Sequence, residues 1–92
     1  MKEYTDEFMI NFQTWCGEYA GQTTDCLIYG TREDTDEFWN ELREEMKSSE
    51  LLYHNFGESY GYSDFELTQE MIEEIEDCVE DLKTAYRNGE FD

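Results

Sequence analysis

The chain has 92 residues, 38% hydrophobic and 16% aromatic, so we expect one folded domain over residues 1–92, not a disordered chain. Its 25 acidic and six basic residues give a net charge of −19, which repels nucleic acid and anionic membranes and attracts basic protein surfaces. Because no apolar run is long enough for a signal peptide or a membrane span, we expect a cytoplasmic protein.

The first predicted element is a helix from residue 5 to about residue 19, with Thr5 as its N-cap and Gly21 as its end. Its apolar residues recur at helical spacing: Phe8, Phe12, Trp15, Cys16 and Tyr19. A strand over residues 8–12 is the alternative. Residues 22–29 are β-branched and apolar between two glycines, so we expect a strand there.

A second helix is predicted from residue 35 to about residue 47, where the Thr-Asp-Glu-Phe tetrapeptide of the first helix start recurs. Its buried stripe is Phe38, Leu42 and Met46, and both tryptophans, Trp15 and Trp39, are expected in the core. Residues 51–56 and 60–67 are predicted to form two strands, joined into a hairpin by a turn at residues 57–59.

The last predicted helix covers residues 68–89, with Thr68 as N-cap and Gly89 as a left-handed end. Its apolar stripe is Ile72, Ile75, Val79, Leu82 and Tyr86. The sequence therefore predicts an α+β fold, with three helices and a small antiparallel sheet of about three strands.

Familiar catalytic and metal-binding patterns are absent from the sequence. The three cysteines and the single histidine lack zinc-site spacing, so we expect reduced, mostly buried thiols. Asp34 and Asp36 begin like a calcium loop, but Trp39 stands where such a loop needs glycine. There is no glycine-rich phosphate loop. We therefore expect no cofactor, no metal and no enzymatic activity.

The last helix carries seven acids in its first turns: Glu70, Glu73, Glu74, Glu76, Asp77, Glu80 and Asp81. They form eight like-charge pairs at spacings of three or four residues, which cost about 2–4 kcal/mol in total at low salt. A helix whose outer face is merely solvated would intersperse lysines. We therefore interpret the acid row as a binding surface.

Lysine and arginine are absent from Ser48 to Leu82, so the predicted hairpin and the last helix should share one negative surface. Six further acids are predicted to extend it: Asp34, Asp36, Glu37, Glu58, Asp64 and Glu66. Residues 70–81 carry one acid per about 2.6 Å, against one phosphate per about 1.7 Å of duplex DNA. A groove that binds phosphates would then accept this surface in place of DNA.

In length, acidity and aromatic content, and in the run EEIEDCVEDLK at residues 73–83, the chain resembles the Arn-like anti-restriction proteins of T-even phages. The resemblance implies a DNA mimic in the host cytoplasm, a homodimer or larger assembly. The implied target is a host restriction endonuclease of the McrBC type, with other DNA-binding proteins such as nucleoid proteins also possible. Neither direct nucleic-acid binding nor membrane association is expected. Two alternatives stay open: an anti-CRISPR inhibitor, and an acidic regulatory adaptor that binds a basic surface unrelated to DNA binding.

Overall fold

The computed structural model describes residues 4–62 and 64–91, and every regular element in them is helical. The three long helices are α1 (Asp6–Ile28), α2 (Asp36–Met46) and α5 (Gln69–Arg87). A short helical segment between α2 and α5 consists of α3 (Ser49–Leu51), the π-helix η1 (Leu52–Gly57) and α4 (Glu58–Tyr60). Because these residues contain no strand, the predicted α+β fold is wrong and the protein is all-α.

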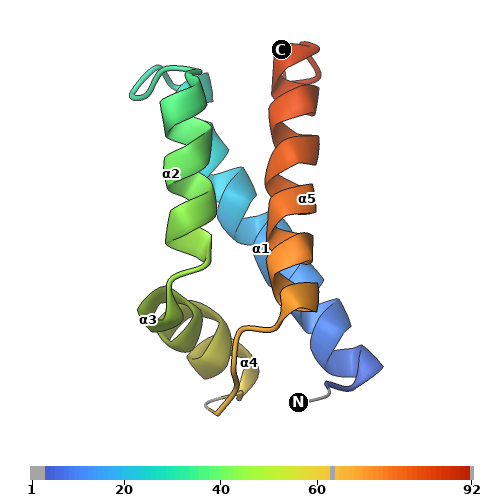
Figure 1. Ribbon diagram of the computed structural model, residues 1–92. Helices are drawn as coiled ribbons and strands as arrows, with labels where there is room; N and C mark the ends of the chain where they lie inside the picture. Colours follow the sequence, from blue (N-terminus) through green and yellow to red (C-terminus); the bar gives the residue numbers. More distant parts are fainter. Residues whose placement is uncertain (1–3, 63, 92) are drawn as a thin grey trace.

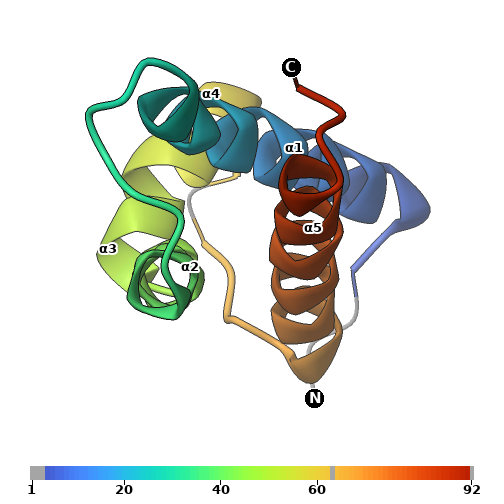
Figure 2. The ribbon, with the colours of Figure 1, turned by 90° about the horizontal axis from the view of Figure 1, so that it is seen from above.

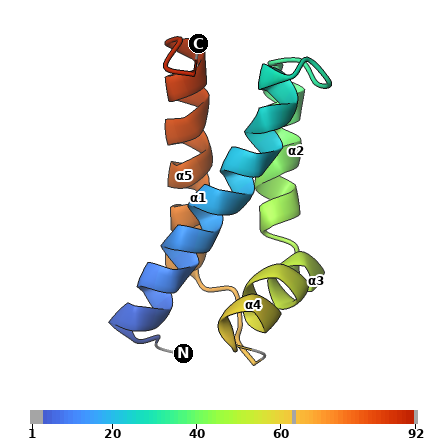
Figure 3. The same ribbon diagram turned by 180° about the vertical axis from the view of Figure 1, so that it is seen from behind.

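The long helices lie in two layers. In Figure 1, α2 and α5 run antiparallel to each other, and α1 crosses behind them. The view from above in Figure 2 and the view from behind in Figure 3 show α1 lying across the other two. The segment from α3 to α4 lies below α2 in Figure 1, at the end of the bundle where α2 finishes. On the described part of the chain, no helix has the length and hydropathy needed to cross a membrane.

Helix α1 is longer than predicted and includes residues 22–28 of the strand that was expected at 22–29, with Tyr29 as its C-cap. It also includes residues 8–12, so the alternative strand there is wrong too. Ala20, Thr24 and Leu27 are buried at helical spacing, which outweighs the β preference of the threonines. The buried Thr24 hydroxyl donates to the Ala20 carbonyl at 2.8 Å and is thereby satisfied within the helix. The helix was expected to end at Gly21, but it continues to Ile28, and Gly30, with a left-handed φ of 79°, follows its C-cap.

The predicted hairpin of residues 51–56 and 60–67 is absent. Leu52 and Phe56 are buried one helical turn apart, so this segment buries a helical stripe. Gly57 lies within the helical segment, and a Cβ there would overlap the Tyr62 carbonyl oxygen. The Gly57 carbonyl in turn accepts a hydrogen bond from the Tyr62 amide at 2.7 Å. The glycine therefore serves a close approach of two backbone segments, not a turn at 57–59. Residue 63 of the second expected strand lies outside the described residues.

The local signals for helix starts are confirmed. The hydroxyls of Thr5, Thr35 and Thr68 each accept a hydrogen bond from the amide three residues later. Helices α2 and α5 keep their predicted extents to within two residues, and Gly89 has the expected left-handed φ, at 79°. The repeated tetrapeptide therefore marks two uses of one capping device.

Aromatic side chains fill much of the core, as expected from the composition. Both Trp15 and Trp39 are buried. The Phe56 ring lies 5.2 Å, between centroids, from the rings of Phe8 and Phe12, and so ties the short helical segment to α1. The three cysteines are free: Cys16 is buried, and Cys26 and Cys78 are half-buried.

Candidate functional site

Helix α5 turns its apolar stripe to the core and divides its seven acids between two sides. Met71, Ile75 and Val79 are buried. At about 100° per residue, Glu76 and Glu80 fall on the side of the helix that faces α2. The other five acids fall on the solvent side and the side that faces α1, within an arc of roughly 100°. We call these five residues the α5 ridge: Glu70, Glu73, Glu74, Asp77 and Asp81.

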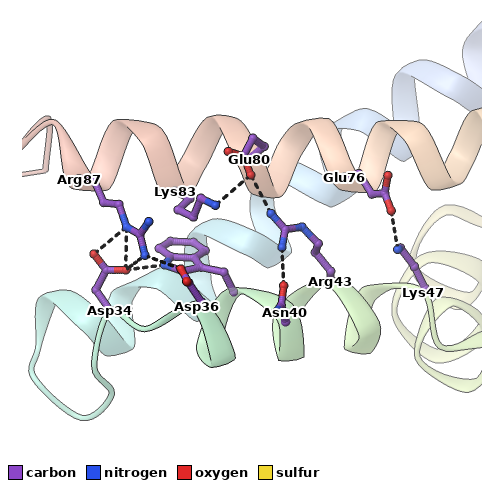
Figure 4. A network of polar contacts seen from close by, with 10 residues as sticks. Asp34, Asp36, Asn40, Arg43, Lys47, Glu76, Glu80, Lys83 and Arg87 are labelled. Carbon is purple, nitrogen blue, oxygen red and sulfur yellow. Dashed lines mark hydrogen bonds and ion pairs between the residues drawn. The ribbon is translucent and has the colours of Figure 1, made fainter.

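The side that faces α2 forms a row of ion pairs, shown in Figure 4. The Lys47 Nζ atom lies 2.8 Å from Glu76 Oε1, and Arg43 Nη2 lies 2.7 Å from Glu80 Oε2. The Lys83 Nζ atom lies 3.2 Å from the same Glu80 oxygen. The three basic side chains are only 20% exposed, so their charges are directed into the contact between the helices.

The ion-pair row ends at the loop between α1 and α2 (Figure 4). Arg87 Nη2 donates to Asp34 Oδ1 and to Asp36 Oδ1, both at 3.1 Å. The indole Nε1 of the buried Trp39 also donates to Asp34 Oδ1, at 2.6 Å. The hydrogen bond from Arg87, with that from Trp39, lowers the pKa of Asp34 against the opposing effect of its desolvation. Asp34 thus joins the loop to both helices.

We call these eight residues the α2–α5 seam: Asp34, Asp36, Arg43, Lys47, Glu76, Glu80, Lys83 and Arg87. With four acids and four bases, the seam is neutral, so the net charge of −19 lies entirely outside it. The only other base in the described residues, Arg32, lies 2.8 Å from Glu41. The described lysines and arginines therefore pair with acids outside the α5 ridge.

The sequence contains a signal for the seam that was missed. The positions along the seam follow one another at steps of four, three and four residues on both helices, in opposite directions. On α2 and its C-cap they are Asp36, Arg43 and Lys47 of the seam with Asn40 between them, and on α5 they are Arg87, Lys83, Glu80 and Glu76. Along this row of positions each helix has its acids nearer the N-terminus and its bases nearer the C-terminus, an order that the helix dipole favours. An antiparallel alignment therefore brings opposite charges together, whereas a parallel one would bring like charges together.

The seam changes the interpretation of four predicted partner-binding acids. Asp34, Asp36, Glu76 and Glu80 are engaged in ion pairs within the protein. The hydrogen bond from Lys47 lowers the pKa of Glu76, and the hydrogen bond from Lys83, with the charge of Arg43, lowers that of Glu80. Residues 48–82 contain no lysine or arginine, but Arg43 and Lys47 of the α2 region lie against this stretch in the folded protein and pair with two of its acids.

The remaining predicted acids outside α5 lie on other elements. Glu37 is exposed on α2. On α4, the Oε1 atom of Glu58 lies 3.5 Å from Nδ1 of His54. Asp64 and Glu66 are exposed in the segment before α5, where the Tyr4 hydroxyl bonds to the backbone of Glu66. The hairpin that was expected to connect these acids is absent from the described residues, so we define the candidate surface by the five ridge acids of α5 alone.

The α5 ridge presents its charge without internal neutralisation. No base of residues 4–62 and 64–91 forms an ion pair with any of its five acids. Gln13 Nε2 of α1 donates to Glu74 Oε1 at 3.0 Å, which orients one carboxylate without cancelling its charge. Residues 70–81 span about 18 Å of helix, so the ridge carries one charge per roughly 3.6 Å. A single strand of duplex DNA carries one phosphate per about 3.4 Å.

Comparisons with protein-family models, with curated proteins and with solved structures found no match to this chain. Among the described residues, no group of three or more histidine, cysteine or acidic side chains is arranged to hold a metal ion. A proposal of function therefore depends on the charge placement on α5.

Proposed function

We propose that this protein is a DNA-mimic inhibitor that occupies the DNA-binding groove of a host protein through the α5 ridge. The separation of charges on α5 is the observation that carries the proposal. The described bases near α5, including Lys83 and Arg87 of the helix itself, pair with acids of the seam. The five ridge acids keep their charge available for a partner.

The ridge is energetically unfavourable in the free protein. Its acids form five like-charge pairs at spacings of three or four residues, which cost about 1–3 kcal/mol at low salt. A groove lined with lysine and arginine would relieve this repulsion. It would also form charge-assisted hydrogen bonds and release the ions that screen both surfaces. The free energy stored in the ridge thus becomes part of the driving force for binding.

The linear charge density supports a definite form of mimicry. The ridge matches one DNA strand in charge per length, so we propose that it replaces one phosphate row in the target groove. The resemblance to Arn-like anti-restriction proteins makes a restriction endonuclease of the McrBC type our first candidate target. A nucleoid protein is the second candidate, because a protein that binds DNA mainly through its phosphates, and not through its base sequence, would accept a phosphate mimic.

Displacement by DNA tests the proposal. The immobilised protein is incubated with a bacterial lysate, and the retained partner is then challenged with excess duplex DNA or with polyglutamate at the same charge concentration. We expect DNA to release the partner at concentrations at which polyglutamate does not, because the groove is shaped for phosphates. A partner that resists excess DNA would overturn the proposal in favour of the acidic adaptor.

A further inference from the structure

A hollow of about 440 Å³ lies between α1 and α5, on the side of α5 that carries the ridge. Gln13 and Gly17 contribute its α1 wall. The other lining residues all come from α5: Glu74, Asp77, Cys78, Asp81, Leu82 and Ala85. Three of the five ridge acids therefore border one concave site.

Gly17 leaves the α1 side of this hollow without a side chain at that position. A Cβ at this position would have no atom within 4 Å, so no packing contact within the protein requires glycine. Glycine inside a helix costs about 0.5–1 kcal/mol relative to alanine. The chain thus has a helix-destabilising residue at the position where a side chain would enter the hollow.

The floor and the rim of the hollow differ in chemistry. Leu82, Ala85 and the half-buried Cys78 supply an apolar floor. Burial, followed by the charges of Asp81 and Glu74, raises the pKa of the Cys78 thiol, so the thiol stays neutral and both carboxylates lie near it. No described base forms an ion pair with Asp77 or Asp81. The site therefore combines an apolar base with an unneutralised acidic rim.

We propose that the hollow receives an arginine side chain from the basic surface of the partner. The alkyl stem would lie on Leu82 and Ala85, and the guanidinium would lie between the rim carboxylates. A guanidinium offers five donors in a planar fork and is weakly hydrated, whereas a lysine ammonium is compact and strongly hydrated. The identity of the partner rests on the proposed function, and the inference adds that this surface selects arginine over lysine.

Two matched leucine substitutions test this inference. Gly17→Leu fills the hollow without changing charge, and Gly21→Leu makes the same change one turn later, where a Cβ also has no atom within 4 Å and the residue does not line the hollow. Both variants should melt at a higher temperature than the parent protein, because leucine favours a helix more than glycine does. A shared rise confirms that both are folded.

Binding is measured with fluorescent octa-arginine and octa-lysine peptides. We expect the parent protein and Gly21→Leu to bind octa-arginine about tenfold more tightly than octa-lysine. In Gly17→Leu this ratio of the two dissociation constants should fall to about threefold or less. An equal preference in the two leucine variants would overturn the inference. Because the assay contains no DNA-binding protein, its outcome is independent of the DNA displacement test, and either proposal can fail alone.

Discussion

The two sides of α5 use the same residue types for opposite purposes. On the seam, Glu76 and Glu80 meet bases at 2.7–3.2 Å and join α5 to α2. On the ridge, Glu73 and Asp77 lie only a few residues away in sequence and form no ion pair with a described base. The position around the helix, not the sequence density of acids, therefore decides whether an acid stabilises the fold or remains available to a partner.

This difference explains how so acidic a chain can form an ordered bundle. The few bases are concentrated where they pair two helices, and the seam is neutral. The repulsion is left mainly on the outer side of α5, where four of the five ridge acids are exposed. If the seam and the ridge are separate in this sense, substitutions on the two sides of α5 should have different effects.

The largest effect on stability is expected from Asp34→Ala. The substitution removes the acceptor of the buried Trp39 indole and the partner of Arg87. Leaving a buried donor unsatisfied costs about 1–3 kcal/mol of unfolding free energy. Urea denaturation should show this loss, while Glu33→Ala, at an exposed neighbour in the same loop, should unfold like the parent. If the two variants unfold alike, Asp34 does not have the structural role assigned to it.

Charge reversal on the two sides of α5 should shift stability in opposite directions. Glu80→Lys places a third cation beside Arg43 and Lys83, so the melting temperature should fall by a few degrees. Asp77→Lys places a cation among three ridge acids, so the melting temperature should rise. Shifts of the same sign in thermal unfolding would show that the two sides are not distinct.

Salt should stabilise the protein, because screening weakens the self-repulsion of a chain with a net charge of −19 more than it weakens the seam. We expect the melting temperature to rise between about 20 mM and about 200 mM sodium chloride, and to rise less in a variant with a neutralised ridge. A flat or falling melting temperature of the parent would contradict this account.

A smaller effect should appear on acidification. The folded-state pKa values of Asp34, Glu76 and Glu80 are lowered by their cationic partners. Their contribution to stability is thus present above the ordinary carboxyl pKa of about 4 and is lost as the pH falls through the lower folded-state values. The free energy of unfolding, measured between about pH 5 and pH 2, should therefore contain a decrease in the parent protein. This decrease should be absent from the triple variant Asp34→Asn, Glu76→Gln, Glu80→Gln. Parallel curves would count against the seam as the source of that loss.

Local sequence signals were sufficient for part of the fold. The threonine caps and the apolar stripe of α2 depend on residues within a few positions of one another, and these predictions are confirmed. The predicted stripe of α5 is confirmed at Ile75, Val79, Leu82 and Tyr86, but Met71 takes the core position in the first turn and Ile72 is only half-buried. Gly21 and the β-branched run after it suggested a helix end and a strand. The burial of Thr24 and Leu27 against other helices overrides that preference, and such tertiary contacts are not visible in a local window.

The candidate site was predictable only in outline. The seven acids of α5 are evident in the sequence, but their division depends on which side faces α2. The matched spacing of the seam residues becomes informative only once α2 and α5 are known to be antiparallel neighbours. The expected sheet had instead placed Glu58 and Asp64 beside the last helix. The structure assigns them to other segments, and the hollow beside Gly17 had no counterpart in the prediction.

The central claim is that the α5 ridge, and not net charge as such, binds the partner. Its most direct test compares two variants that each lose five negative charges. One neutralises the ridge as Gln or Asn, and the other neutralises five exposed acids elsewhere: Asp25, Glu33, Glu44, Glu50 and Glu90. For the partner released by DNA, we expect the ridge variant to bind at least about a hundredfold more weakly and the other variant to stay within about threefold of the parent. Equal weakening in both variants would contradict the claim.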